Sequence, residues 1–213
     1  MRNVLAAAVM LSLAFVLPAA AAPCPGIVVL QDSFTTPNPA IDSTANAQSK
    51  ITIQGGKAEV TFLQPAMGRD DEYTGIQYGD VNVCGTFATA KTDKAENQAA
   101  GLIFWGTDYT AFYSFQIQPA IGQFAVLQLV PGTGWALPLA WTASTAIVKD
   151  MGAANTLMVQ TQGKVVSLFI NGQKVGTYTG TPPAGGGVVG FSVSTSTPSL
   201  DTWDVTDFSV GVP

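Results

Sequence analysis

Few side chains in this sequence could carry out chemistry, because it contains no histidine. That absence excludes Ser-His-Asp and Cys-His catalysis and His-based zinc sites. Phosphate-cradling glycine loops lead from a strand into a helix, whereas the glycines here fall at the turns of expected hairpins. Carboxylates, cysteines and aromatic side chains therefore remain as candidates, and we assign no catalytic residue and no metal ligand.

Asp70, Asp71 and Glu72 form the acidic cluster of the sequence and lie beside Arg69 in the segment 65–73. We interpret this segment as a charged surface loop in which neighbouring carboxylates point in different directions and are solvated. A calcium site is the first alternative, because calcium favours loop carboxylates and carbonyls. Glycoside hydrolysis, which needs two carboxyl groups flanking the bond, is the last. We expect no cofactor, and calcium is the one left open.

A second pair of carboxylates, Asp204 and Asp207, lies in the last apolar segment of the chain. The two residues are out of phase with a two-residue alternation. We therefore interpret them as charges that protect an edge strand from aggregation.

Residues 1–21 have the features of a secretory signal peptide, with Arg2 before the apolar run Val4–Leu17 and a tract of alanines after it. The apolar run is short for a membrane span. We expect cleavage after Ala21 and a secreted or periplasmic protein with no membrane insertion; a retained anchor is the alternative.

Cys24 and Cys84 are the two cysteines, and both lie in the part expected to be exported. An oxidising compartment favours a disulfide between them. The bond would tie the start of the mature chain to a strand within 81–90. Two unpaired buried thiols are the alternative.

Residues 22–213 are enough for a single domain with a large core, and one β-sandwich of this length is common. The whole sequence has 9 basic and 14 acidic residues, which gives a net charge of −5. Nucleic acids and anionic membranes bind basic patches. The charge therefore disfavours both as partners.

Residues 99–143 must position most of the aromatic candidates, and they form four apolar runs separated by short Gly, Pro, Thr and Asp clusters. This pattern predicts an antiparallel meander. Ala111, Tyr113, Phe115 and Ile117 occupy alternate positions in it, so one face of that strand is expected to pack on the core.

Further short strands are expected on both sides of the meander, at 27–34, 50–54, 57–63, 74–78, 80–90, 155–162, 164–170, 188–195 and 203–210. Asn171-Gly172 predicts a type I′ hairpin, whose turn needs two residues that tolerate positive φ. About a dozen strands, with no amphipathic helix after residue 21, predict an all-β fold, namely a two-sheet antiparallel jelly-roll sandwich.

The alternation also predicts which side chains leave the core. Those expected to point inward are Leu102, Phe104, Ala125, Leu127 and Leu129; those expected to point outward are Ile103, Trp105, Phe112, Ser114, Gln116, Phe124, Val126 and Gln128. Aromatic rings stack on sugar C–H surfaces and amides bond hydroxyls. The candidate ligand-binding residues are therefore Trp105, Phe112, Gln116, Gln128, Trp135 and Trp141. The alternative is that these aromatics pack in the core or under loops.

The order of the segments resembles a known superfamily. The succession DSF, GGKAEVTF, AAGLIFWGTDYTAFYSFQI, GQFAVLQL, VVSLFINGQKVGTY, GGGVVGFSV and WDVTDFSV, over about residues 27–210, is similar to a concanavalin A-like lectin/glucanase domain. More narrowly, it resembles laminin-G-like and family-16-glycosidase-like domains, including those grouped as 3-keto-disaccharide hydrolases. Retaining glucanases of this superfamily carry their acids as Glu-x-Asp-x-x-Glu, a run that this sequence lacks.

These observations favour an exported, non-catalytic carbohydrate-binding or cell-surface interaction module, with a glycan or cell-surface polysaccharide as its partner. A glycoside hydrolase of the 3-keto-disaccharide type is the alternative that the resemblance implies. A structural envelope protein without a ligand is the third interpretation.

Overall fold

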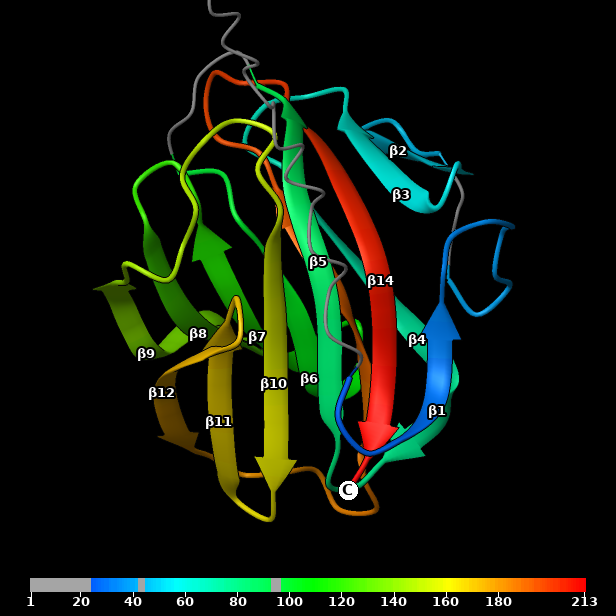
Figure 1. Cartoon of the computed structure of the whole chain (residues 1–213), viewed down its shortest axis with the longest axis vertical. Coiled ribbons are helices and arrows are strands. Elements are labelled where there is room, and N and C mark those ends of the chain that lie inside the picture. The colour runs from blue at the N-terminus through cyan, green and yellow to red at the C-terminus, as the bar shows by residue number, and fades with distance from the viewer. Residues whose placement is uncertain (1–23, 42–44, 93–96) are drawn as a thin grey trace, which may run out of the picture.

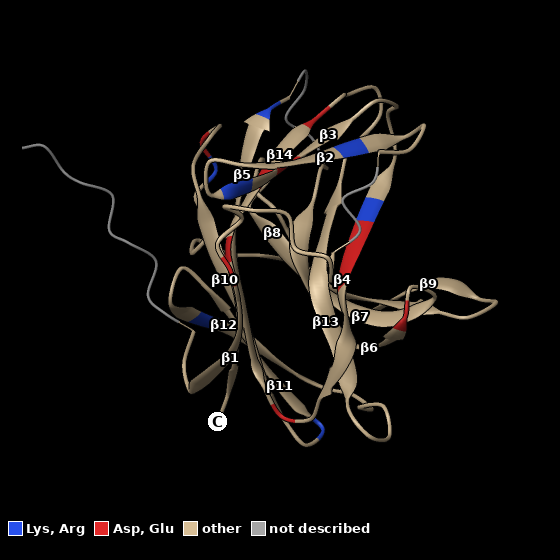
Figure 2. Ribbon diagram, turned by 90° about the vertical axis from the view of Figure 1, so that its right-hand side faces the viewer, with Lys and Arg blue, Asp and Glu red and all other residues tan. Residues whose placement is uncertain are grey.

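The computed structural model describes residues 24–41, 45–92 and 97–213, which form two antiparallel sheets packed face to face (Figure 2). The eight-stranded sheet has the order β12 (Gln173–Thr179), β11 (Val165–Ile170), β10 (Asn155–Gln162), β5 (Asn82–Lys91), β14 (Thr202–Val212), β3 (Lys57–Phe62) and β2 (Ser49–Gln54), and β1 (Ile27–Asp32) also pairs with β14 (Figure 1). The six-stranded sheet has the order β4 (Gly68–Tyr78), β13 (Gly187–Ser194), β6 (Ala100–Asp108), β7 (Ala111–Gln118), β8 (Gln123–Val130) and β9 (Gly134–Ala143). The predicted two-sheet jelly-roll sandwich is confirmed.

The core lies between the sheets and is rich in aromatic rings. Tyr73 of β4 stacks on Phe208 of β14 with ring centroids 4.5 Å apart, and Phe191 of β13 meets Phe208 edge to face at 6.3 Å. All three side chains are buried. Because removing a buried ring of this size costs about 3–5 kcal/mol, such contacts hold the sheets together and fix the position of β4.

Cys24 and Cys84 form the expected disulfide, with their Cα atoms 5.7 Å apart. Cys84 lies in β5, between β10 and β14, so the bond fastens residue 24 to the middle of the eight-stranded sheet. The expected signal peptide, residues 1–21, lies outside the described residues. Within the described part of the chain, no helix has the length and apolar character that crossing a membrane requires.

The Asn171-Gly172 turn joins β11 to β12 as predicted, with φ values of +50° and +77°. Asp204 and Asp207, by contrast, do not lie on an edge strand. β14 pairs with β5 on one side and β3 on the other, and Asp204 forms an ion pair with Lys57 of β3 at 2.9 Å. Asp207 lies at a register shift in β14 with a φ of +53°. The edge-protection interpretation is therefore wrong.

The predicted alternation holds in β7 and in β6 as far as Phe104, fails at Trp105, and is reversed in β8. Leu102, Phe104, Tyr113, Phe115 and Ile117 all pack in the core, as expected. In β8 the core residues are Phe124 and Val126, whereas Ala125, Leu127 and Leu129 point away from it. Directly paired residues share a face of a sheet, and Val126 pairs with Phe115. Because both sets of alternate residues in β8 are apolar, the sequence pattern did not distinguish its two faces.

β9 forms one edge of the six-stranded sheet and carries Pro138 at its middle. Trp135 and Leu137 of this strand are 51% and 47% exposed. Residues 109–148, which include all of β7, β8 and β9, contain no Asp, Glu, Lys or Arg. The β8–β9 hairpin projects away from the sandwich (Figure 2) and presents an uncharged surface there.

Candidate functional site

The acidic cluster lies in β4 and not in a loop. Residues 68–78 form one continuous strand, along which side chains alternate between the two faces. Arg69 and Asp71 point toward the core and form a buried ion pair, with Nε and Oδ2 2.8 Å apart. Asp70 and Glu72 point to the outer face of the six-stranded sheet. The predicted solvated turn is therefore wrong, because Arg69 neutralises Asp71 inside the sandwich and the remaining two carboxylates share one face.

A row of paired residues extends from Asp70 across this outer face. Asp70 lies opposite Ser192, Ser192 opposite Gly101, and Gly101 opposite Gln116. The Gln116 amide Nε2 donates a hydrogen bond to Ser192 Oγ at 3.2 Å, across the glycine. A Cβ at Gly101 would lie 2.0 Å from the Phe115 carbonyl oxygen. The row therefore carries a carboxylate, a hydroxyl and an amide on one face, and the Ser192 and Gln116 side chains are buried.

A second row lies beside the first and contains Glu72, Gly190, Ile103 and Ser114. Glu72 is 1% exposed, and Ile103 and Ser114 are fully buried. The Glu72 Oε1 and Ser114 Oγ atoms are buried and have no hydrogen-bond partner among the described residues. Buried polar atoms are normally paired, so this row holds two groups with unused hydrogen-bonding capacity.

The carboxyl groups of the two rows hold their protons more tightly than free carboxyl groups. Burial, together with the charges of Asp70 and Asp108, raises the pKa of Glu72 to about 7. Burial also raises the pKa of Asp70, although a hydrogen bond with Ser192 opposes the change. A carboxyl group that titrates near neutral pH can exchange a proton under ordinary conditions, and such groups cluster at functional sites.

The β6–β7 hairpin lies against Glu72. Trp105 has a φ of +51°, and the pairing between β6 and β7 shifts register between Phe104 and Asp108. This irregularity brings Gly106 close to the acid: a Cβ at Gly106 would be 3.3 Å from Glu72 Oε1. The hairpin therefore covers the Glu72 end of the second row.

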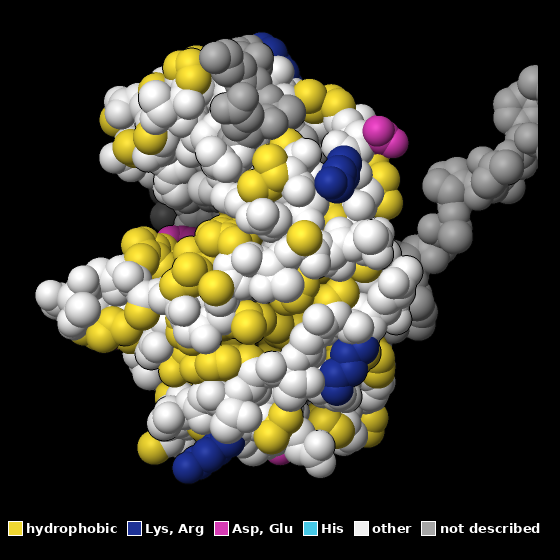
Figure 3. Space-filling view, turned by 90° about the vertical axis from the view of Figure 1, so that its left-hand side faces the viewer, with side chains coloured by type: hydrophobic (Ala, Val, Ile, Leu, Met, Phe, Trp, Pro, Cys, Tyr) yellow, Lys and Arg dark blue, Asp and Glu magenta, His cyan; other side chains and the backbone are white. Residues whose placement is uncertain are grey.

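The hairpin tip, residues 107–110, extends toward β4. Tyr109 lines a cavity of about 280 Å³ together with Gly68, Arg69 and Asp70 of that strand. In Figure 2, acidic residues on β4 and on the tip lie on the same side of the molecule. Figure 3 shows that the surface is hollowed above the projecting β8–β9 hairpin, with an acidic side chain inside the hollow. We call the outer face of the six-stranded sheet that carries the two rows the groove.

An aromatic rim adjoins the groove. Phe112 of β7 is buried, and the exposed ring of Trp135 packs on it edge to face, with centroids 5.6 Å apart. Phe112 also lines a cavity of about 210 Å³ with Trp105, Tyr113, Gln128, Leu129, Pro131, Thr181, Pro182 and Pro183, among others. This volume lies below the 300–1,000 Å³ typical of ligand pockets, so it suits one ring of a larger ligand.

The six predicted binding residues fall into three groups. Trp105, Phe112 and Gln128 line the rim cavity, and Trp135 contacts Phe112. Gln116 belongs to the first row of the groove. Trp141 lies at the β9 end of that row, because Thr142 pairs with Phe124 and the neighbouring Ala125 pairs with Gln116. The structure therefore brings four of the six together at the rim and places Gln116 and Trp141 along the first row of the outer face.

Trp105 and Gln128 do not lie on the outer face as the alternation predicted. Trp105 is 5% exposed, and its ring contacts Phe104 and Tyr113 at 5.4 and 5.5 Å, because its positive φ breaks the alternation. Gln128 pairs with Tyr113 and shares the core side of the sheet with it. Both residues reach the rim cavity from within. Sequence reasoning did not consider Ser192 and interpreted Asp70 and Glu72 as solvated loop residues, although alternate acids at 70 and 72 were a usable signal once a strand is assumed.

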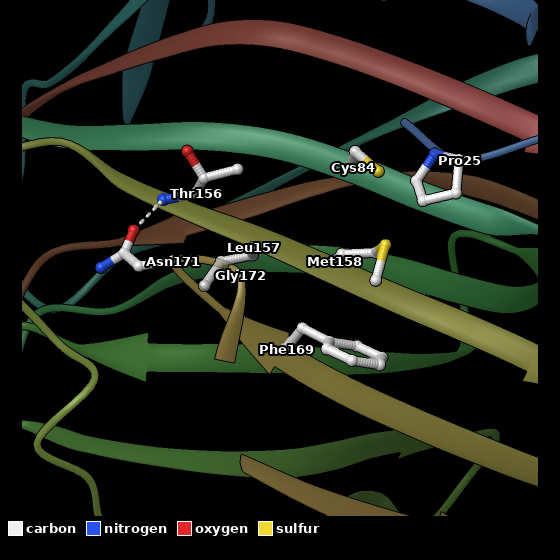
Figure 4. Close-up of a pocket in the computed structure, with 8 residues that line it drawn as sticks. All are labelled: Pro25, Cys84, Thr156, Leu157, Met158, Phe169, Asn171 and Gly172. Atoms are coloured by element: carbon white, nitrogen blue, oxygen red, sulfur yellow. Dashed lines mark hydrogen bonds between the residues drawn. The ribbon is translucent and has the colours of Figure 1, made fainter. Parts of the chain in front are cut away.

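A larger cavity, of about 330 Å³, lies on the outer face of the other sheet. Figure 4 shows its lining, which includes Met158, Phe169, Pro25 and the disulfide sulfur of Cys84. The Asn171 carbonyl Oδ1 there accepts a hydrogen bond from the Thr156 backbone N–H at 2.8 Å. This cavity is mostly apolar, and the side-chain amide of Asn171 is already used in the hydrogen bond to the β10 backbone. The groove is therefore the stronger candidate.

The calcium site that the sequence left open has no support in the described ranges, where no group of three or more Asp, Glu, Cys or His side chains is arranged to hold a metal ion. Asp70 and Glu72 share a face, and Asp71 points to the opposite one. The acidic cluster is therefore divided between two environments.

No protein-family model matches this sequence, and no curated protein sequence matches it either. Solved structures, however, share its fold. A protein of unknown function with a galectin-like fold from Bacillus subtilis superposes with a TM-score of 0.65 at 12% identity, over 87% of this chain and 96% of that chain. The carbohydrate-binding module CBM66 from Bacillus subtilis gives a TM-score of 0.60 at 12% identity, over 78% of this chain and 92% of that chain.

A β-glucanase from Bacillus licheniformis is also similar, with a TM-score of 0.54 at 11% identity, over 89% of this chain and 100% of that chain. Likeness at such low identity concerns the fold alone. The chain has the concanavalin A-like jelly-roll fold, as the resemblance in its sequence predicted. Carbohydrate-binding modules and glycanases both use this fold, so the residues of the site must decide between them.

Proposed function

We propose that this protein is an exported, non-catalytic carbohydrate-binding module and that the groove with its aromatic rim holds the glycan. The observation that carries the proposal is the position of Trp135. This ring is half exposed, stands on Phe112, and lies on the same outer face as Gln116 and Ser192, whose side chains are bonded to each other and are 6% and 3% exposed. An exposed aromatic face beside fixed hydrogen-bonding groups is what a sugar ring requires.

The neighbours of the fold support this proposal. CBM66 is named as a carbohydrate-binding module, and a galectin-like fold describes another neighbour. The disulfide between Cys24 and Cys84 supports export, because such bonds form and persist in oxidising compartments. The absence of charge over residues 109–148 fits a neutral ligand at the rim.

A glycan array followed by titration calorimetry tests the proposal. Trp135→Ala should weaken the best ligand at least about tenfold, since losing an aromatic anchor at a binding surface costs more than about 1–2 kcal/mol. Phe169→Ala is the control, because it removes an aromatic ring from the outer face of the other sheet, away from the groove. It should change affinity less than about twofold. Equal losses in both variants, or an array without any bound glycan, would reject this site.

Glycoside hydrolysis is a second candidate that one observation favours. Asp70 and Glu72 are two carboxyl groups on one face of a strand, and the pKa of Glu72 near 7 suits a proton donor. Glu72 is, however, covered by the β6–β7 hairpin. Incubation of the protein with the array's best ligand distinguishes the two functions: products that disappear in Asp70→Asn and Glu72→Gln would establish an enzyme, and intact ligand would support the binding module.

A further inference from the structure

Glu72 is a buried acid that glycan binding at the rim leaves unexplained. The residue is 1% exposed, its Oε1 is buried with no hydrogen-bond partner among the described residues, and the base of the β6–β7 hairpin lies against it. We infer that ionisation of Glu72 lifts the hairpin tip, residues 107–110, and thereby opens the second row of the groove to ligand. This inference rests on the proposed function, because the access that it controls is access of the glycan.

The surroundings of Glu72 supply negative charge and no described positive charge. On its own strand the neighbour on the same face is Asp70, and the hairpin contributes Asp108. Tyr109, on the same hairpin tip, lines a cavity with Asp70. Neither β13 nor β7 carries a charged residue. Arg69 lies on the opposite face of β4, where it binds Asp71. A charge on Glu72 is therefore buried without a counter-ion and close to two other carboxylates.

A buried charge without a partner is costly, so the group either stays protonated or becomes exposed. Burial, with the charges of Asp70 and Asp108, raises the pKa of Glu72 to about 7, so the protonated form is favoured below neutral pH. Above it, the charge on Glu72 repels Asp108, which is carried by the tip itself. The repulsion therefore acts on the element that covers the acid, and movement of that element lets water reach the carboxylate.

The hairpin is built so that its tip can move as a unit. Thr107 Oγ1 donates to the Ala111 carbonyl at 3.4 Å, and the Thr110 backbone N–H donates to Asp108 Oδ1 at 2.7 Å. Both bonds lie within the hairpin and persist when it swings. Trp105, with its φ of +51°, is anchored in the core at the base and marks the point about which the tip turns.

Opening would add hydrogen-bonding groups to the binding surface. Ser114 Oγ lies in the same row as Glu72, is fully buried, and has no partner among the described residues. In the open state the Glu72 carboxylate accepts hydrogen bonds from ligand hydroxyls, and bonds to a charged acceptor are about twice as strong as neutral ones. Glycan affinity is therefore expected to rise as the pH passes through 7.

Amide hydrogen exchange tests the opening without any ligand. Protection factors correct for the intrinsic effect of pH on the exchange rate. For residues 106–111 they should fall about tenfold or more between pH 5.5 and 8.5. In Glu72→Gln they should change less than about twofold, because the amide does not ionise. Asp108→Asn, on the exposed tip, should show a smaller fall than wild type. Asp207→Asn is the matched control for removing a carboxylate elsewhere and should behave as wild type.

A protection factor that is constant with pH in the wild type would overturn the inference, and so would the same fall in Glu72→Gln. The glycan supplies a second measurement: its affinity should rise about tenfold over this pH range in the wild type and stay within about twofold in Glu72→Gln. Failure of the proposed function would appear as the absence of any bound glycan. Failure of the inference would appear as binding that does not depend on pH, so the two results are distinguishable.

Discussion

Replacing Glu72 by glutamine should make the protein more stable at neutral pH. Burial and nearby carboxylates raise the pKa of this group from its ordinary 4.5 to about 7. Each tenfold change in an ionisation equilibrium is worth about 1.4 kcal/mol, so the buried charge costs on the order of 3 kcal/mol when it forms. Glutamine keeps nearly the same shape and cannot ionise, so the variant avoids this cost.

The sign of the pH dependence follows from proton uptake. Between pH 4.5 and 7 the folded protein holds the Glu72 proton that the unfolded chain has released. The free energy of unfolding of the wild type therefore falls as the pH rises through this window and levels off above about pH 7. Opening of the hairpin tip limits the loss to the cost of opening, so about 3 kcal/mol is the upper bound.

Urea unfolding of the wild type and Glu72→Gln at intervals from pH 4 to 8.5 measures this difference. Contributions from other titrating groups largely cancel between the two curves, and the remaining difference should grow in favour of Glu72→Gln above pH 4.5. Parallel curves across the whole range would refute the reasoning, because they would mean that Glu72 ionises equally easily in the folded and unfolded protein.

Three further changes have expected outcomes that unfolding experiments can check. Replacing Cys24 and Cys84 by serine opens a loop with a sequence separation of 60 residues and should cost about 4 kcal/mol in the chain-entropy model; no change in midpoint would contradict that value. Trp105→Ala removes a buried ring and should lower the free energy of unfolding by about 3–5 kcal/mol. Trp135→Ala removes an exposed ring and should lower it by less than about 1 kcal/mol. Equal losses in the two variants would contradict the different burial of the two rings. Asp71→Asn should cost about 3–5 kcal/mol because it removes the negative charge that compensates the buried Arg69 guanidinium, and a loss below 1 kcal/mol would count against that ion pair.

The fold followed from the sequence because short strands with a two-residue period admit few arrangements. The meander 99–143 became four consecutive strands, and Asn171-Gly172 formed its hairpin. Both features depend on local preferences, namely alternation on a pleated strand and tolerance of positive φ. Local signals of this kind survive folding when tertiary contacts agree with them.

The site followed less well, for reasons that involve distant residues. Asp70 and Glu72 could not be assigned to one face while the segment was interpreted as a loop, and that interpretation came from four adjacent charged residues. The charges are tolerated in a strand because Arg69 and Asp71 pair inside the sandwich. The alternation fails at Trp105 because this residue has a positive φ. The neighbouring residues give no sequence signal for that backbone conformation.

The edge strand β9 has a consequence for how the molecule behaves in concentrated solution. Exposed strand edges attract other strands, and proteins usually discourage this with lysine or proline. β9 has no charge, so Pro138, which lacks a backbone N–H, is its main defence against an added strand. The uncharged strand that carries Trp135 of the proposed glycan site thus depends on Pro138 to keep neighbouring molecules from pairing with it into a longer sheet.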